Sequence, residues 1–156
     1  MTGLPPLRRA RPDDATAIAH LVNRAYEKYL PRIGLPPTPM LADYLEVVAQ
    51  HDVWVCEADG AVAAVLVLIP EDEVLLIENI AVDPALQARG LGRRLMAFAE
   101  AQARQRGFAA LRLYTNEKMT ENLAFYTRLG YRETGRNVFR ERFIVDMRKD
   151  LATLRP

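Results

Sequence analysis

The segment at residues 74–94, VLLIENIAVDPALQARGLGRR, constrains the fold of this 156-residue chain more than any other. It opens with nine mostly apolar residues suited to a β-strand, and it ends with glycines where an amphipathic helix is expected to begin. A strand that is apolar on both faces must be covered on both, so helices are expected over its sheet. The chain is therefore predicted to form a layered α/β domain.

The rest of the sequence predicts one domain spanning residues 1–156, because the chain is short for two separate cores. Strands are expected at residues 7–10, 53–57, 61–69, 74–82 and 111–115, with two more inside 131–147. Helices are expected at residues 13–29, 40–50 and 90–107, and from an N-cap at Thr120 to Gly130. The Asp59-Gly60 pair predicts a tight hairpin turn between the second and third strands.

Two further expectations concern loops and the core. Residues 30–39 hold four of the ten prolines, which predicts a stiff loop without regular helix. Helical spacing predicts a shared apolar stripe of Leu41, Tyr44, Leu45 and Val48 in the second helix. The two tail strands are also supported by alternation of Phe139, Phe143, Val145 and Met147 with Arg140, Arg142 and Asp146.

Charge and cysteine content exclude several classes of function. Lys and Arg total 21 against 20 for Asp and Glu, so no nucleic-acid or membrane partner is expected, and any anion site must be local. No targeting or membrane-spanning run is visible, which predicts a cytoplasmic protein. The single cysteine, Cys56, and the two histidines, His20 and His51, have no metal-ligand spacing, so no metal is expected. Cys56 is interpreted as a small buried hydrophobe rather than a nucleophile.

Glu78 places a carboxylate inside the apolar strand at residues 74–82. Burying a carboxylate without partners is costly, because the charged form loses its hydration. Two interpretations therefore stay open for Glu78. It is either one member of a structural pair or a base that faces a cleft.

The turn after this strand contains Gln87, Gly90 and Gly92, followed by a helix. Glycines allow backbone N–H groups to approach a ligand, and the first helical turn has unpaired amides that favour an anion. Arg89, Arg93 and Arg94 add positive charge there. A solvated basic turn is the alternative. The dinucleotide fingerprint is excluded because Leu95 stands where a third glycine is required, and no P-loop sequence is present.

Taken together, these features resemble the GNAT (Gcn5-related N-acetyltransferase) superfamily. The resemblance is carried by Ile80-Ala81-Val82-Asp83-Pro84, by Gln87, Gly90 and Gly92 in a Gln-x-x-Gly-x-Gly pattern, and by the run from Asn122 to Tyr131 that includes Tyr126. It implies the GNAT fold: a mixed, mostly antiparallel central sheet of about six to seven strands, splayed between strands 4 and 5, with about four helices on its faces.

The resemblance also implies roles for particular residues. Acetyl-CoA is the expected acyl donor, Glu78 the general base and Tyr126 the general acid; the alternative for Tyr126 is a core aromatic. The family often has an asparagine where Met119 stands here, so Asn116 or Asn122 is expected to take over that cofactor contact. The other expected cofactor contacts are Ile80, Ala81, Val82, Gln87, Ala88, Arg89, Gly90, Leu91, Gly92, Arg93 and Arg94.

The acceptor is implied to be a small-molecule or peptide amine near Tyr29 and Arg32, although both residues could equally lie on the surface. A homodimer is possible, as in relatives. Two other functions stay open at this point: a non-catalytic acyl-CoA-binding module on the same fold, and a small anion-binding domain.

Overall fold

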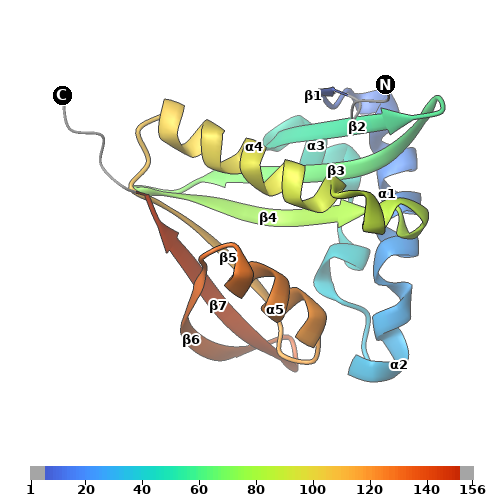
Figure 1. Ribbon diagram of the computed structural model, residues 1–156. Coiled ribbons are helices and arrows are strands. Elements are labelled where there is room, and N and C mark those ends of the chain that lie inside the picture. Colours follow the sequence, from blue (N-terminus) through green and yellow to red (C-terminus); the bar gives the residue numbers. More distant parts are fainter. Residues whose placement is uncertain (1–5, 152–156) are drawn as a thin grey trace. The chain divides into compact units, whose positions relative to one another are not determined.

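The computed structural model describes residues 6–151. Its elements follow the predicted order along the chain, from blue to red in Figure 1. The strands are β1 Leu7–Arg9, β2 Asp52–Ala58, β3 Ala61–Pro70, β4 Val74–Val82, β5 Ala110–Asn116, β6 Arg132–Phe139 and β7 Arg142–Asp150. The α-helices are α1 Ala15–Tyr26, α2 Leu30–Ile33, α3 Tyr44–Gln50, α4 Leu91–Gln105 and α5 Thr120–Arg128. The 3-10 helices are Pro12–Asp14, Glu27–Tyr29, Thr38–Leu41 and Pro84–Arg89.

The strands are hydrogen-bonded in the order β1-β2-β3-β4-β5-β7-β6, and β4 and β5 are parallel. This confirms the predicted mixed, mostly antiparallel sheet. The chain divides into two compact units. Unit 1 holds the described residues up to Leu68 together with Asn79–Ala97, and unit 2 holds Ile69–Glu78 together with the described residues from Phe98.

Unit 1 is built on the antiparallel strands β1, β2 and β3 and on helix α1. The turn between β2 and β3 has positive φ at both Asp59 (53°) and Gly60 (79°), which matches the twist of the flanking strands and confirms the predicted hairpin. One face of α1 is buried at helical spacing and supplies Ile18, Leu21, Val22 and Ala25 to the core.

Unit 2 contains β5, β7 and β6 as an antiparallel set in which β7 lies between β5 and β6 (Figure 1). β6 and β7 form a hairpin. Directly opposed residues share a face, so the buried residues Leu113 and Met147 lie on one face of the sheet. Tyr114 and Asp146 are opposed on the other face, and both are half-buried. This second face carries most of the polar side chains discussed below.

The proline-rich segment differs from the prediction. Residues Leu30–Ile33 form the short helix α2, because Pro31 occupies the first turn, where a missing N–H costs nothing. Gly34 ends this helix with a φ of 83°. The second predicted helix begins at Tyr44 rather than residue 40, because the Asp43 carboxylate accepts from Leu45 N (3.1 Å) and Glu46 N (3.4 Å) and caps it there.

Two of the apolar patterns are only partly buried. In and before α3, Tyr44 is buried but Leu41 and Leu45 are more than half exposed. At the tip of the β6–β7 hairpin, Phe139 and Phe143 are about half exposed, and Arg142 is buried at 7%. Phe139 pairs with Arg142 and Phe143 with Val138, so the two rings lie on opposite faces, because the alternation along one strand does not continue across the turn.

One cap also differs. Helix α5 begins at Thr120 with Met119 in the N-cap position, and the Thr120 hydroxyl donates to Glu121 Oε1 at 3.0 Å. The predicted Thr120 cap is therefore wrong by one residue. At the end of α4, Gly107 adopts a φ of 78°, as expected of a residue that ends a helix.

Candidate active site

The turn between β4 and α4 lies in unit 1 and is shaped mainly by backbone. The Asp83 carboxylate accepts a hydrogen bond from Ala85 N at 3.0 Å and starts the 3-10 helix. Gln87 Nε2 donates to Val82 O at 3.2 Å and ties the turn to the end of β4. Gly90 then ends the 3-10 helix with a φ of 78°, a conformation that residues with a Cβ adopt only with strain.

The first turn of α4 has backbone N–H groups that no carbonyl of the helix can accept from. Its hydrogen bonding starts with Arg94 N donating to Gly90 O at 3.1 Å. The N–H groups of Leu91, Gly92 and Arg93 precede that bond, so α-helical geometry offers them no carbonyl inside the helix. Because α4 has 15 residues, its dipole adds a positive potential at the same end. These groups form a suitable site for a phosphate or another anion.

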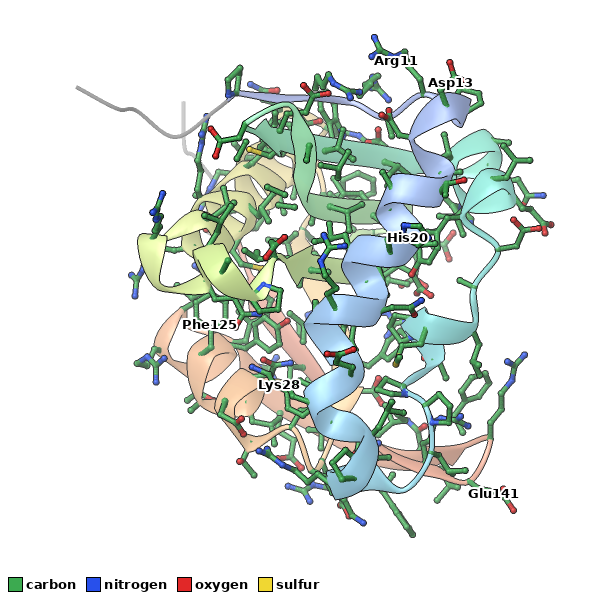
Figure 2. The ribbon with its side chains drawn as sticks, turned by 90° about the vertical axis from the view of Figure 1, so that its right-hand side faces the viewer. Arg11, Asp13, His20, Lys28, Phe125 and Glu141 are labelled. Carbon is green, nitrogen blue, oxygen red and sulfur yellow. The ribbon has the colours of Figure 1, made fainter. Side chains whose placement is uncertain are left out.

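Cations lie at this turn and on the helix beside it. Arg89 and Arg93 are exposed, and Arg94 is half-buried. From α1, Arg24 Nη2 donates to Asp83 Oδ2 at 3.2 Å. From the 3-10 helix Glu27–Tyr29 that follows α1, Lys28, labelled in Figure 2, places Nζ 3.5 Å from Gln87 Oε1. The turn is therefore anchored to α1 and is locally positive. Ala88 was also expected to contact the cofactor through its backbone. Its side chain is not among those that the structure describes.

Asn79 is a buried amide that the sequence reasoning missed. Tyr26 Oη donates to Asn79 Oδ1 at 2.9 Å and lies 3.2 Å from Ile80 O. Asn79 Nδ2 donates to Tyr44 Oη at 3.0 Å, and that hydroxyl donates to Pro39 O at 2.6 Å. This chain of hydrogen bonds joins β4 to α1 and to the start of α3. An asparagine inside an apolar strand was the available signal.

Glu78 belongs to unit 2 and is half-buried. Tyr114 Oη donates to Glu78 Oε2 at 2.7 Å. Burial raises the pKa of Tyr114 far above its usual value, and the hydrogen bond and charge of Glu78 raise it further. The hydroxyl thus stays protonated and acts as a neutral donor. Glu78 thus has a partner, and that partner is a neutral hydroxyl rather than a cation.

Tyr114 was not among the predicted site residues. β4 and β5 pair in parallel from Val74–Ala110 to Ile77–Leu113, and Glu78 and Tyr114 are the next residues on the two strands. The two side chains therefore meet one residue beyond the last of these backbone pairs. This meeting depends on strand register, which the sequence did not supply.

Charged groups beside Tyr114 are already paired within unit 2. Arg112 donates to Glu71 Oε1 at 2.6 Å and to Glu71 Oε2 at 3.2 Å, and it lies 3.6 Å from Asp146. The Glu71 hydrogen bond is the main reason that the pKa of Arg112 is raised. Asp146 also accepts from Asn137 Nδ2 at 2.6 Å.

Tyr126 lies on α5 and is only 6% exposed. Its ring centroid is 5.5 Å from that of Phe125, which Figure 2 labels, and 6.1 Å from that of Tyr131 in an edge-on arrangement. Burial raises the pKa of Tyr131 well above its usual range. The packing holds the Tyr126 ring in place and fits both roles that the sequence left open.

The two candidate asparagines lie on either side of Met119. Asn116 is buried, and its Oδ1 accepts from Lys118 N at 2.9 Å. Asn122 is half-buried, with Nδ2 3.6 Å from the Met119 sulfur. Thr115 Oγ1 lies 3.5 Å from the same sulfur. Met119 is therefore buried among polar groups at the position where the family often has asparagine.

Tyr29 and Arg32 lie together at the start of α2. Tyr29 is 3% exposed, so it is not the surface residue that the sequence left possible. Arg32 is exposed, and its guanidinium carbon lies 5.3 Å from the centroid of the Tyr29 ring. Lys28 Nζ is 5.1 Å from the same centroid. The arrangement is a buried ring with two cations beside it.

The remaining candidates fit structural roles. Cys56 is fully buried, and burial raises the pKa of its thiol, which disfavours a nucleophilic thiolate. His20 is exposed on α1 (Figure 2). Among residues 6–151, no three His, Cys, Asp or Glu side chains gather as a metal site. Within the same described range, every helix is too short or too polar to cross a membrane.

The chain resembles known proteins over a stretch that includes the Gly90 turn, Glu78 and Tyr126. The sequence profile of the acetyltransferase (GNAT) family matches residues 15–131. The chain is 29% identical over 140 residues to the uncharacterized N-acetyltransferase YjgM of Escherichia coli (strain K12), covering 81% of each chain.

Two solved structures show the same fold. The PaiA N-acetyltransferase of Thermoplasma acidophilum was solved with coenzyme A and has a TM-score of 0.79 at 15% identity. The match covers 97% of this chain and 100% of that one. The ribosomal-protein-S18-alanine N-acetyltransferase of Escherichia coli has a TM-score of 0.77 at 21% identity, over 96% of its length and 97% of this chain. With the family profile covering most of the chain, this protein belongs to the acetyltransferase (GNAT) family.

Proposed function

We propose that the protein transfers the acetyl group of acetyl-CoA directly to a primary amine, within one domain that comprises both units. Family membership supports acetyl transfer, and the coenzyme A complex of the Thermoplasma protein supports the choice of carrier. The observation that carries the proposal is the Gly90 turn. There, helix N-terminal amides and several cations come together in a form suited to a diphosphate.

In this proposal the cofactor is bound mainly by backbone. Within residues 87–94, the N–H groups of Leu91, Gly92 and Arg93 hold the diphosphate. Arg89, Arg93 and Arg94 supply positive charge. The pantetheine arm pairs with the backbone of residues 80–82 at the end of β4. Asn116 and Asn122 are the candidates for the contact that Met119 cannot make.

Proton transfer is assigned to unit 2. A lysine-like amine with a pKa of about 10.4 is neutral in only about one molecule in 2,500 at pH 7, a cost of roughly 4.6 kcal/mol. Glu78 accepts the proton of the amine, directly or through water, while the nitrogen attacks the thioester carbon. As the tetrahedral intermediate collapses, the carbon–sulfur bond breaks and Tyr126 protonates the departing thiolate. No covalent intermediate on the protein is involved.

The acceptor is assigned to the side of Tyr29 and Arg32. The exposed Arg32 guanidinium suits an acceptor that carries a carboxylate near its amine. The buried Tyr29 ring keeps that part of the chain in place.

A panel of amine acceptors, with and without a neighbouring carboxylate, tests this function. Each amine is mixed with acetyl-CoA and the protein, and release of free thiol is measured together with the acetylated product. We expect at least one acceptor to give equal amounts of thiol and acetylated amine. Binding of CoA without transfer to any amine would instead support the non-catalytic module.

A further inference from the structure

The Glu78–Tyr114 hydrogen bond gives the proposed base a fixed partner. We propose that Tyr114 is a positioning residue that holds Glu78 Oε2, so that Oε1 receives the proton of the acceptor amine. This inference rests on the proposed function, in which Glu78 is the base. The hydrogen bond itself is a property of the structure whether or not that function is correct.

The geometry supports a positioning role. The donor–acceptor distance of 2.7 Å is that of a strong hydrogen bond to a carboxylate. One residue earlier on each strand, Ile77 of β4 pairs with Leu113 of β5. The backbone ladder therefore fixes the strands next to Glu78, and the Tyr114 hydroxyl restrains the side chain where that ladder ends.

The protonation state of Tyr114 fixes the direction of the hydrogen bond. Burial, then the hydrogen bond to Glu78, then its charge, all raise the pKa of Tyr114. A phenol that holds its proton this firmly is a poor general acid near neutral pH, so Tyr114 donates to Glu78 without giving up its proton.

Other charged groups on this face of unit 2 are engaged elsewhere. Arg148 on β7 is directly opposite Arg112 and donates to Asp150 Oδ1 at 2.7 Å. Arg112 on β5 is held by both oxygens of Glu71, in the turn before β4. Asp146 on β7 is directly opposite Tyr114 and is bonded by Asn137 from β6. Arg112 lowers and Asp146 raises the pKa of Tyr114, and both effects are smaller than those of burial and Glu78. The donor that reaches Glu78 in this group is thus Tyr114.

The pH dependence of turnover tests the role of Tyr114. In Tyr114→Phe we expect the acid limb of the pH–rate profile to move up by about one pH unit, because the carboxylate loses a hydrogen bond. We also expect plateau turnover to fall about tenfold while the KM for acetyl-CoA stays the same. Tyr131→Phe is the matched control, since Tyr131 also lies in unit 2 and also has a pKa raised by burial. Its acid limb should stay in place, and an unmoved limb in Tyr114→Phe would overturn the inference.

Two further measurements separate this inference from the proposed function. If Glu78→Gln keeps the acid limb, Glu78 is not the base and the proposed mechanism fails by itself. The Glu78–Tyr114 pair is then tested by carbon-13 NMR of the Glu78 carboxyl group in the full chain. A higher titration midpoint in Tyr114→Phe supports the pair, and the same midpoint in both proteins contradicts it. This readout also serves if the variant is inactive, and a thermal melt shows whether it is folded.

Discussion

The Gly90 turn in unit 1 and the Glu78–Tyr114 pair in unit 2 are built in different ways. The turn presents backbone N–H groups, and its shape depends on one left-handed residue at a φ of 78°. The pair depends on two side chains that meet one residue beyond the Ile77–Leu113 pair of β4 and β5. A backbone site should tolerate changes of side chain but not of conformation, and a side-chain site should respond in the opposite way. The predictions below test that contrast.

The largest effect is expected from Glu78→Gln. The amide cannot accept the proton of the amine, so turnover should fall by about 100-fold or more at pH 7. The dissociation constant for CoA, measured by calorimetry, should stay the same, because the turn in unit 1 is unchanged. An equal loss of affinity and turnover would break the contrast between the two regions.

Tyr126→Phe should have the next largest effect. Removing the hydroxyl deletes the proton donor for the thiolate but keeps the ring packed against Tyr131, so turnover should fall by roughly 10- to 100-fold. Acetyl-CoA affinity should change little. A wild-type rate would make Tyr126 a core aromatic, the other role that the sequence allowed.

Gly90→Ala tests the backbone side of the comparison. A Cβ at Gly90 meets no atom within 4 Å, but the φ of 78° is strained for alanine, and the turn should shift. We expect CoA affinity to fall about tenfold, by calorimetry, as the amides lose their alignment. Gly107→Ala is the matched control, with the same φ and the same free space at the other end of α4. It should cost similar stability, so equal losses of affinity in both variants would contradict the prediction.

Asp14→Asn tests a carboxylate with a purely structural role. Arg8 donates to Asp14 at 2.8 and 3.0 Å and is the main reason that the pKa of Asp14 is lowered, with a further hydrogen bond from Arg11 N. A lowered pKa in the folded state stabilises the protein above the unfolded value of 3.8, and that stability is lost as pH falls through the folded pKa. The variant should lose about 1 kcal/mol at pH 7, measured by urea denaturation, and keep its turnover. A stability difference that persists unchanged at pH 2 would contradict this account.

Arg93→Ala should have the smallest effect. Arg93 is exposed, so its charge should add only about 0.3 to 1 kcal/mol to diphosphate binding, a change of roughly two- to fivefold in affinity at low salt. The difference from wild type should shrink as salt is raised. A larger loss than in Gly90→Ala would mean that side chains, rather than backbone, dominate the cofactor site.

The sequence predicted those parts of the fold that short-range rules control. Asp59-Gly60 determined the hairpin because both residues accept positive φ, and the apolar periodicity of α4 placed that helix within two residues at each end. The Gly90 turn was predicted for the same reason. Its chemistry follows from glycine conformation and the geometry of a helix N-terminus, which are local properties.

The parts that the sequence did not predict depend on longer-range contacts. Tyr114 reaches Glu78 only because β4 and β5 pair in one particular register. The buried Asn79 network requires Tyr26 and Tyr44 to arrive from two other elements. Phe139 pairs with Arg142 and Phe143 with Val138, so the two rings lie on opposite faces of the hairpin, and both are about half exposed. In the first two cases the missing information was a partner distant in the sequence, and in the third it was the register across a turn.

Nitrogen-15 NMR titration of the chain of residues 1–156 with CoA tests the central claim most directly, because it observes the backbone amides of residues 87–94 one by one. The account predicts that the N–H signals of Leu91, Gly92 and Arg93 shift with rising CoA and saturate together. Saturable shifts located elsewhere, with these three signals unmoved, would contradict it.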